Sequence, residues 1–389
     1  MNVVGLSWDY FVRGLDGKSK GNFEIRQCEC AKNLTNLIRI VYSPRSANKN
    51  KVITSSNMHI YYTSSISRVF FAIDVIKIIM NIRKKIKIDL ITAEDPVFAG
   101  IVGILVKYIF KIPLNVQLHY DAIDNPYRLA ERKRNYVYNI VTKWVVRRAD
   151  SIRVPSIELQ EKLLSLGINK ERIWIIPVGV TVSKFENASG DKIRKYYLRD
   201  RFDKIILYVG RLSPEKDIPT LLLAFKEILK NHETTLLLLV GEGKEREHLK
   251  VSVKEYGIEN NVIFCGPIDY EILPEYYAAS DIFVLPSLRE GRASVLVEAV
   301  LTKKPIVTTN VSGARDCVVD GKTGFIIESQ NCKKMVEKIV YLLDNPDVAM
   351  QFGKTGYEHF NKNLKEANEV KALIHSWEEA TKIKFANQR

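Results

Sequence analysis

Two glutamates with seven residues between them raise the first chemical question in SLREGRASVLVEAV, residues 287–300. Glu290 stands beside Gly291, and Glu298 lies within an apolar run. Burying a carboxylate is costly unless some group donates hydrogen bonds to it. Glu298 therefore either faces water or receives its donors from a bound ligand. Carboxylates are well suited to accept hydrogen bonds from pairs of sugar hydroxyls.

The same stretch is expected to begin a helix directly after the strand-like run DIFVLPS, residues 281–287. Residues from Gly291 to Val295 would form its first turn, where backbone N–H groups have no partner inside the helix. Such groups bind phosphate oxygens. We therefore expect phosphate contacts close to the two carboxylates.

Two cations follow another strand-like run, where KIILYVG leads into GRLSPEKDIPTL, residues 210–221. Gly210 permits a tight turn. Arg211 and Lys216 lie on the loop, and Asp217 is placed to cap the helix that follows. Two cations beside a helix amino terminus form an anion site, and a diphosphate is its natural occupant.

A third loop, in LLVGEGKERE (residues 238–247), contains Gly241 and Gly243. It lacks the third glycine of a dinucleotide fingerprint, which argues against a nicotinamide site. A tight turn whose backbone approaches a ligand closely explains these glycines better. Cations for phosphate and carboxylates for hydroxyls together describe a nucleotide sugar.

Short β-rich runs alternate with helix-length runs along almost the whole chain. This alternation predicts an α/β protein with two doubly wound, Rossmann-like domains that face each other. We expect an acceptor-binding domain over residues 1–185 and a nucleotide-sugar-binding domain over 186–365, joined by the polar segment 183–197 as a linker. Residues 366–389 are expected to form a helix that crosses back to the first domain. Because ligands bind at the carboxyl ends of parallel strands, the site should lie in the interdomain cleft.

The order of these motifs, from ADSIRVPS to about residue 345, resembles the retaining, glycogen-synthase-like GT-B glycosyltransferases of family 4. Their E-x7-E signature is matched by Glu290 and Glu298. The resemblance implies the GT-B fold and a hexosyltransferase that moves a sugar from a nucleoside diphosphate to an acceptor hydroxyl with retention of configuration. It places the reaction in surface polysaccharide, glycolipid or glycoconjugate synthesis.

The resemblance also implies roles for individual residues. Arg211 and Lys216 match the pair that grips the donor diphosphate and stabilises it as the leaving group. Glu298 matches the residue that holds the ribose hydroxyls, and Glu290 the residue near the transferred sugar. Ser294 and Val295 would offer main-chain donors to the phosphates. The predicted donor-binding set is Gly210, Arg211, Lys216, Gly241, Glu290, Gly291, Ser294, Val295 and Glu298.

In the first domain, His119 of QLHYD matches a histidine that often lines the sugar site of this family. The alternative is that His119 has no role in a site and is an ordinary core or surface histidine whose hydrogen bonds are made within the protein. Asp121 and Asp124 are weaker candidates nearby. The predicted catalytic residues are Glu290, His119, Arg211 and Lys216.

Three features depart from the family pattern. The glycine-rich loop after the first strand is replaced by the longer stretch Asp16–Asn22, and VGVT (residues 178–181) lacks the usual carboxylate. Arg292 and Ala293 replace the phenylalanine and glycine that usually follow the first glutamate. The last change bears on the choice of sugar or acceptor.

No Asp or Glu is placed as a covalent nucleophile, which fits the same-face substitution proposed for this family. The chain contains no acidic DxD triplet, so protein cations are expected to replace a metal ion, and no cofactor is expected. Two alternatives stay open. One is a nucleotide-sugar 2-epimerase of the same fold, and the other is a non-catalytic basic binding protein.

The net charge of +14 is located in the first half of the chain. Up to Phe185 there are 29 Lys and Arg against 15 Asp and Glu. The densest patches are Arg83, Lys84, Lys85 and Lys87, and the stretch between Arg128 and Arg148. The second patch interleaves cations with aromatic and aliphatic residues. This mixture suits an anionic membrane surface and a lipid-linked or other sugar acceptor, although a solvated basic helix face explains the charge equally simply. Nucleic acid is not expected, since no recognition motif accompanies the charge.

The composition is that of a globular protein, with 46% hydrophobic and 27% charged residues. No apolar run reaches the roughly 18 to 20 residues of a spanning helix. The first residues lack the features of a signal peptide, and the five cysteines have no metal-ligand spacing. We therefore expect a reduced, cytoplasmic protein, peripheral on the inner face of the cell membrane if the basic patch binds lipid.

Overall fold

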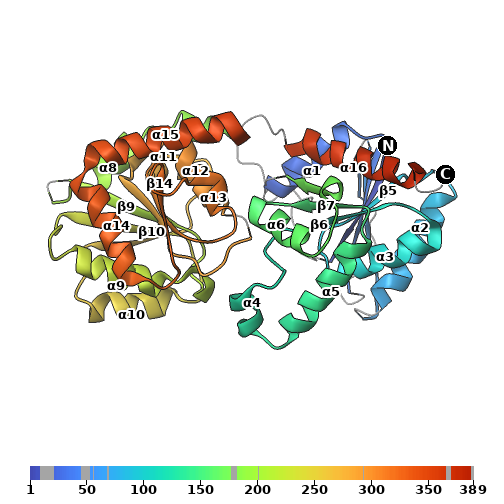
Figure 1. Cartoon of the computed structure of the whole chain (residues 1–389), viewed down its shortest axis with the longest axis horizontal. Helices are drawn as coiled ribbons and strands as arrows, with labels where there is room; N and C mark the ends of the chain where they lie inside the picture. The colour runs from blue at the N-terminus through green and yellow to red at the C-terminus, as the bar shows by residue number, and fades with distance from the viewer. Residues whose placement is uncertain are drawn as a thin grey trace. The chain divides into compact units, whose positions relative to one another are not determined.

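The computed structural model describes residues 1–8, 22–44, 53–55, 57–67, 70–176, 182–199, 201–291, 293–364 and 369–386. The chain divides into two compact units. Unit 1 comprises Met1–Pro177 with Ala367–Arg389, and unit 2 comprises Val178–Glu366 (Figure 1). The sequence stretches 16–21 and 178–181, and Arg292, all singled out above, lie outside the described residues.

Unit 1 is built on one eight-stranded sheet with the order β3-β4-β2-β1-β5-β6-β7-β8. Its neighbouring strands are parallel, apart from the antiparallel pair β3 and β4. Strands β2 to β4 lie on one side of β1, and strands β5 to β8 lie on the other. The direction in which strands are added therefore reverses between β1 and β5, which is the topological switch point of the sheet. The strands are β1 (Asn2–Ser7), β2 (Asn36–Val41), β3 (Ile53–Ser55), β4 (Met58–Tyr62), β5 (Leu90–Ala93), β6 (Leu114–Gln117), β7 (Ser151–Val154) and β8 (Ile173–Ile175).

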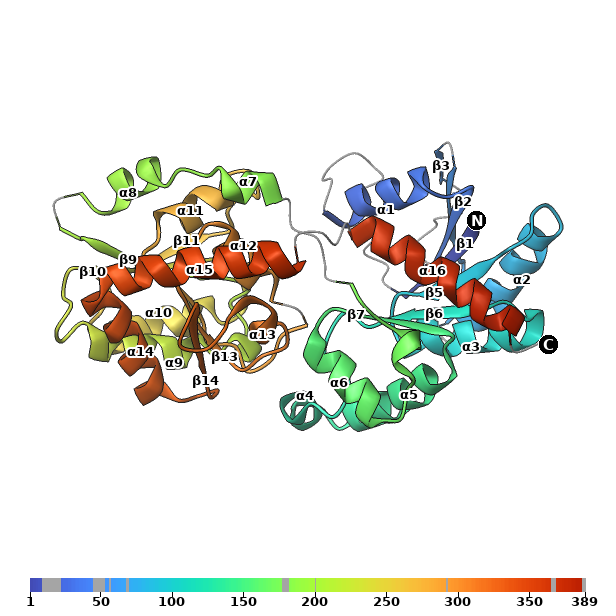
Figure 2. The ribbon, with the colours of Figure 1, turned by 45° about the horizontal axis from the view of Figure 1, so that its top comes forward.

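Helices cover both faces of this sheet, with α1 and α16 side by side on one face and α2, α3 and α5 on the other (Figures 1 and 2). Helix α3 begins where the Asp95 carboxylate accepts hydrogen bonds from the backbone N–H groups of Val97, Phe98 and Ala99. The helices are α1 (Asn22–Lys32), α2 (Phe71–Arg83), α3 (Phe98–Phe110), α4 (Pro126–Glu131), α5 (Arg134–Arg148), α6 (Ile157–Ser165) and α16 (Glu369–Ala386).

Unit 2 is built on a six-stranded sheet with the order β11-β10-β9-β12-β13-β14, and all of its neighbouring strands are parallel. The central strands β9, β10 and β12 are nearly continuous apolar runs that are buried on both faces, as parallel strands between two helix layers must be. The switch point lies between β9 and β12. The strands are β9 (Lys204–Val209), β10 (Thr235–Val240), β11 (Val262–Gly266), β12 (Ile282–Leu285), β13 (Ile306–Thr309) and β14 (Gly324–Ile327).

The helices of unit 2 include two in the segment that the sequence predicted to be a linker. They are α7 (Val182–Glu186) and α8 (Asp191–Tyr197), and both pack on α11. The other helices are α9 (Ile218–Ile228), α10 (Arg246–Glu255), α11 (Leu273–Ala279), α12 (Ser294–Leu301), α13 (Ala314–Cys317), α14 (Cys332–Asp344) and α15 (Pro346–Leu364), and a 3-10 turn spans Pro214–Lys216.

The predicted α/β class with two doubly wound sheets is confirmed. The predicted domain boundary after residue 185 is wrong, because Phe185 is buried in the core of unit 2 against Tyr270 and Tyr277. The boundary lies at Pro177 instead. The final helix, α16, belongs to unit 1, where Trp377 is buried in a core cluster with residues of α1 and β2.

Candidate active site

In unit 2 the loops after β9 and β12 meet at the switch point of the sheet, where ligands bind in open parallel sheets. The two loops are joined by a hydrogen bond from the Leu288 backbone N–H to the Glu215 carbonyl, at 2.9 Å. The predicted diphosphate loop and the predicted glutamate loop are therefore neighbours in space, as the sequence required.

The Lys216 ammonium lies 2.5 Å from the Glu290 carboxylate. Both side chains are almost buried, with 11% and 9% of their surface exposed. The Ser287 hydroxyl donates to the same Glu290 oxygen at 2.7 Å. Buried charges need such partners, since each desolvated ion alone is very unfavourable. The structure thus brings together two predicted catalytic residues, and it adds Ser287 as a third member.

Arg211 lies on the same loop with its guanidinium open to solvent, 75% exposed and 2.9 Å from Glu215. Its backbone is fixed by the buried Tyr208, whose hydroxyl donates to the Arg211 carbonyl at 2.9 Å. The loop therefore presents one exposed cation, Arg211, and one buried cation, Lys216. An exposed ion pair is held weakly, so Arg211 is available to an anionic ligand.

Gly210 and Gly241 allow the loops after β9 and β10 to pack backbone against backbone. Gly241 has a φ of +128°, and a Cβ atom added there would overlap the Gly210 carbonyl. In the same way a Cβ on Gly243 would overlap the Leu212 carbonyl. The close approach expected of Gly241 is thus made to a neighbouring loop, and its contact with a donor stays a prediction.

Glu298 is buried in α12, and only the Tyr277 hydroxyl among the described residues donates a side-chain hydrogen bond to it, at 2.7 Å. Burial raises the pKa of Glu298 to about 7, although the Tyr277 hydrogen bond acts in the opposite direction. The carboxylate does not face water. Its internal donor leaves unmet acceptor capacity, which is what a ribose-binding carboxylate requires.

Helix α12 begins at Ser294 with Ala293 at the N-cap, and Ala293 contributes no side-chain cap. Ser294 and Val295 therefore occupy the first turn, as predicted, and Gly291 lies in the loop before it. The first N–H groups of a helix have no acceptor within the helix itself, and this turn stands at the carboxyl end of β12, where phosphate binding was predicted.

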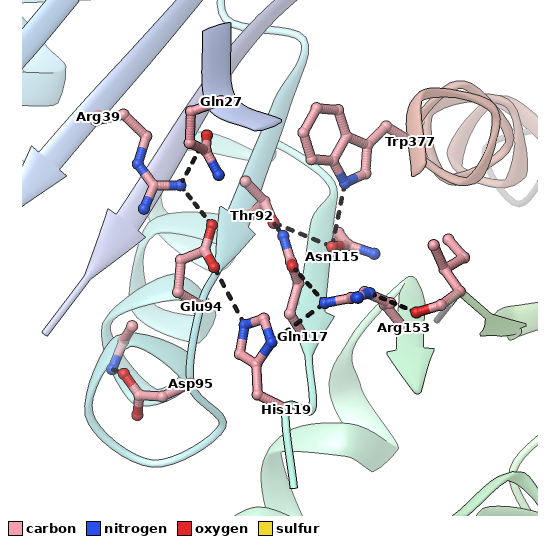
Figure 3. A network of polar contacts seen from close by, with 12 residues as sticks. Gln27, Arg39, Thr92, Glu94, Asp95, Asn115, Gln117, His119, Arg153 and Trp377 are labelled. Atoms are coloured by element: carbon pink, nitrogen blue, oxygen red, sulfur yellow. Dashed lines mark hydrogen bonds and ion pairs between the residues drawn. The ribbon is translucent and has the colours of Figure 1, made fainter. Parts of the chain in front are cut away.

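In unit 1, His119 follows β6 and both of its ring nitrogens have protein partners (Figure 3). Nε2 lies 3.2 Å from a Glu94 oxygen, and Nδ1 lies 3.1 Å from the Arg153 guanidinium. Because a guanidinium only donates, Nδ1 must be the acceptor. The proton of the neutral ring is then on Nε2, where it is donated to Glu94.

Glu94 connects His119 to Arg39, which forms an ion pair with the other carboxylate oxygen. Burial alone would raise the pKa of Glu94, but the Arg39 charge and the hydrogen bond from His119 hold it well below its usual range. Glu94 is therefore ionised, and it orients the imidazole. Gly5 on β1 makes this possible, since a Cβ there would crowd the Arg39 side chain.

The polar network continues into the core of unit 1 (Figure 3). Gln117 donates to Thr92 at 3.0 Å, Thr92 donates to Asn115 at 3.0 Å, and the Trp377 indole N–H donates to Asn115 at 3.2 Å. The C-terminal helix α16 is thereby tied to the layer beneath His119. Such satisfied buried networks make a core rigid.

Asp121 and Asp124, the weaker candidates, are occupied in local structure. Asp121 lies 2.6 Å from Lys162, and Asp124 lies 2.6 Å from Lys143. Neither is presented as a free acid or base. No group of three or more His, Cys, Asp or Glu in the described part of the chain is arranged to hold a metal ion.

Sequence reasoning missed Tyr277, Glu94, Arg39 and Arg153 as members of the two sites. Glu94 could have been identified from the sequence, since it directly follows the apolar part of the strand-like run KIDLITAED, at the carboxyl edge of the sheet. Arg153 lies within a strand and Arg39 within another, where a charged residue is unusual and indicates a buried partner. Nothing in the sequence distinguishes Tyr277 from the neighbouring tyrosine.

Two family models match the chain. "Glycosyl transferases group 1" matches residues 190–359, and "Glycosyltransferase Family 4" matches residues 39–184. The two matches fall on the two units in turn and together cover most of the chain.

Three known proteins illustrate the likeness. The capsular polysaccharide biosynthesis glycosyltransferase CapM of Staphylococcus aureus is 29% identical over 266 residues, which are 66% of this chain and 68% of CapM. Sucrose-phosphate synthase from Thermosynechococcus elongatus superposes with a TM-score of 0.78 at 21% identity, over 97% of this chain and 99% of that one. Anabaena HepE, solved in complex with UDP-glucose, superposes with a TM-score of 0.71 at 19% identity, over 97% and 100%.

The family models cover both units, both sheets have the doubly wound topology, and the E-x7-E pair lies at the switch point of unit 2. The chain belongs to the GT-B glycosyltransferases of family 4.

Proposed function

We propose that this protein transfers a hexose from a nucleoside diphosphate sugar to an acceptor hydroxyl with retention of anomeric configuration. The observation that carries the proposal is the buried Lys216–Glu290 pair beside Arg211 at the switch point of unit 2. A diphosphate would accept hydrogen bonds from the cations Lys216 and Arg211, and the hydroxyls of a sugar would donate hydrogen bonds to the Glu290 carboxylate. HepE, which has the same fold, binds UDP-glucose in its solved structure.

In the proposed reaction the bond between the sugar C1 and the diphosphate oxygen breaks, and a bond forms from C1 to the acceptor oxygen on the same face. The acceptor proton passes to a phosphate oxygen of the leaving diphosphate. Arg211, Lys216 and the first turn of α12 stabilise the charge that develops on that group. These protein cations take the place of a metal ion in the proposal, and Glu298 holds the ribose.

The neutral, Nε2-protonated His119 is assigned a positioning role at the sugar side of the site. Its two nitrogens are engaged by Glu94 and Arg153, so it is not available as a general base in this arrangement. The ring edge and the backbone at the end of β6 would set the shape of the sugar pocket. This role agrees with a mechanism in which the leaving phosphate takes the proton.

The acceptor is proposed to be a sugar or a lipid-linked sugar in surface polysaccharide, glycolipid or glycoconjugate synthesis. CapM, whose name places it in capsular polysaccharide synthesis, supports this part of the proposal. The basic first half of the chain supports a peripheral position at the cytoplasmic face of an anionic membrane. No helix in the described ranges is long and apolar enough to cross a bilayer.

Incubation with the UDP, GDP and ADP forms of common hexoses tests the proposal, with and without candidate acceptors. The expected result is release of nucleoside diphosphate that depends on an acceptor and is lost in Glu290→Gln. Conversion of the donor to a new nucleotide sugar without acceptor would establish the 2-epimerase instead. Binding of the donor with neither outcome would indicate the non-catalytic binding protein.

A further inference from the structure

Helices α2, α3 and α5 form one layer on one face of the unit 1 sheet (Figure 1). Gly100 allows α3 to approach α5 closely, because a Cβ there would lie 3.0 Å from Val145. At the other side of α3, the Arg83 guanidinium at the end of α2 lies 4.8 Å from the centre of the Phe110 ring. The three helices thus present their outer sides as one surface, which we call the α2–α3–α5 face.

The outer side of this helix layer carries many apolar side chains. A helix layer that faces water alone usually carries polar side chains there. Tyr108 is 62% exposed and Ile140 is 67% exposed, although both lie on helices whose inner sides pack in the core. The exposed apolar residues follow helical spacing along each helix, so each helix has an apolar outer stripe. They are Ile73, Met80, Ile101, Leu105, Tyr108, Ile109, Tyr136, Val137, Ile140 and Trp144.

The charges on the same three helices are almost all positive. The helices contain seven Lys and Arg, and their one acidic residue, Asp74, accepts a hydrogen bond from Ser65 at 2.7 Å. Four of the cations are in the last turns, among them Arg83, Lys107 and Arg148. Each helix runs back from the carboxyl edge of the sheet, so these last turns gather at the opposite edge.

Aromatic and cationic groups are also in direct contact on this face. The Arg148 guanidinium lies 4.5 Å from the centre of the half-exposed Trp144 ring. This pairing places an apolar ring and a cation at the same level, as at the boundary between lipid headgroups and acyl chains. Water alone does not favour ten exposed apolar side chains on one layer.

We propose that the α2–α3–α5 face binds the surface of an anionic lipid bilayer, with its apolar stripes inserted below the headgroups and its cations among the phosphates. The inference deepens the proposed function, because it specifies the partner of the acceptor-side unit. Two of the seven cations, Lys107 and Lys143, already form ion pairs with Asp150 and Asp124. Charge complementarity still selects the bilayer, since a neutral apolar partner would desolvate the last-turn cations Arg83, Arg147 and Arg148 without supplying an anion. The contact is peripheral and reversible, because each stripe inserts only side chains.

Co-sedimentation with vesicles tests this surface without any dependence on catalysis. The full chain is mixed with vesicles of phosphatidylcholine alone or with added phosphatidylglycerol, at low and at high salt. We expect binding that requires the anionic lipid and weakens with salt. Lys84 is the C-cap residue of α2, and Arg147 lies in the last turn of α5. Replacing both by Glu should lower the partition coefficient at least about fivefold per charge reversed. Leu105→Ser with Ile109→Ser should lower it at least about tenfold.

Leu223→Ser with Val251→Ser is the matched control, because these exposed apolar residues lie on α9 and α10 of unit 2. It should bind vesicles like the wild type. Stabilisation by UDP in a thermal-shift assay should be the same in all variants, which separates this surface from the donor site. Equal binding to both kinds of vesicle, or no binding to either, overturns the proposal. A dimer in solution that Leu105→Ser with Ile109→Ser dissolves, without vesicle binding, assigns the face to a second copy of the chain instead.

Discussion

Lys216 and Glu290 form an ion pair at 2.5 Å, although 73 residues separate them in the sequence, and little of either side chain is exposed. Removing one partner of such a pair leaves an uncompensated buried charge. The pair ties the two loops at the switch point of unit 2 to each other. A preorganised arrangement of this kind is what electrostatic stabilisation of a leaving group requires.

Lys216→Met should therefore lower the free energy of unfolding by about 3 kcal/mol, because it leaves the Glu290 carboxylate buried with Ser287 as its donor. The double variant Lys216→Met with Glu290→Gln should recover much of this loss. Urea denaturation followed by circular dichroism measures both. The single variant Glu290→Gln completes the comparison. If the losses of unfolding free energy in the two single variants simply add in the double variant, the two side chains do not stabilise each other and the ion pair is contradicted.

The raised pKa of Glu298 predicts a dependence of stability on pH. Burial raises this pKa from 4.5 to about 7, so the folded state holds its proton more tightly than the unfolded state. The associated stability is present below pH 4.5 and is lost as the pH rises through about 7. Glu298→Gln should remove this loss, and its unfolding temperature relative to wild type should be higher at pH 8 than at pH 5. An equal difference at both pH values would contradict the assignment.

The same carboxyl predicts proton release when a nucleotide binds. A ribose that donates hydrogen bonds to Glu298 favours the ionised form, so binding should displace the proton from the fraction that carries it. Calorimetric titration with UDP at pH 7 in buffers of different ionisation enthalpy measures the number of protons released. We expect fewer protons to be released by Glu298→Gln than by the wild type. If the wild type and Glu298→Gln release the same number of protons on binding UDP, the ribose does not bind to Glu298.

The arrangement of His119 predicts a single ring tautomer. Arg153 donates to Nδ1 at 3.1 Å, so the proton of the neutral ring should be on Nε2. Nitrogen-15 spectra of the histidine side chains report which nitrogen carries the proton, and His119→Asn identifies the signal. Detection of the Nδ1–H form in the wild type would show that the guanidinium does not act on the ring as described.

Gly241 predicts a loss of stability and of donor binding in Gly241→Ala. The added Cβ would overlap the Gly210 carbonyl and separate the loops after β9 and β10. Gly257→Ala is the matched control, since Gly257 also has a positive φ of +67° but has open space around its Cβ position. The control should lose only about 1 kcal/mol, the cost of the strained backbone. Equal losses in both variants, measured by thermal unfolding, would mean that loop packing has no part in the effect.

The sequence predicted the parallel sheets and the placement of Glu290, Lys216 and Arg211, because runs of buried strand residues and the loops after them are local patterns. It did not predict the His119 network. Glu94, His119 and Arg153 follow or lie on three adjacent strands, and only the strand order and register bring them together. The predicted linker and boundary at residue 185 were wrong because Phe185 is flanked by polar residues in the sequence, and the residues that bury it, among them Tyr270 and Tyr277, are far from it along the chain.

The anomeric configuration of the product tests the central claim most directly. Once the donor panel identifies a substrate, the wild-type reaction with an α-linked nucleotide hexose is followed by proton NMR, before the product can equilibrate. We predict that the first product carries the sugar in the α configuration, through departure and attack on one face at Arg211, Lys216 and Glu290. A first product in the β configuration would contradict retention and the role assigned to this site.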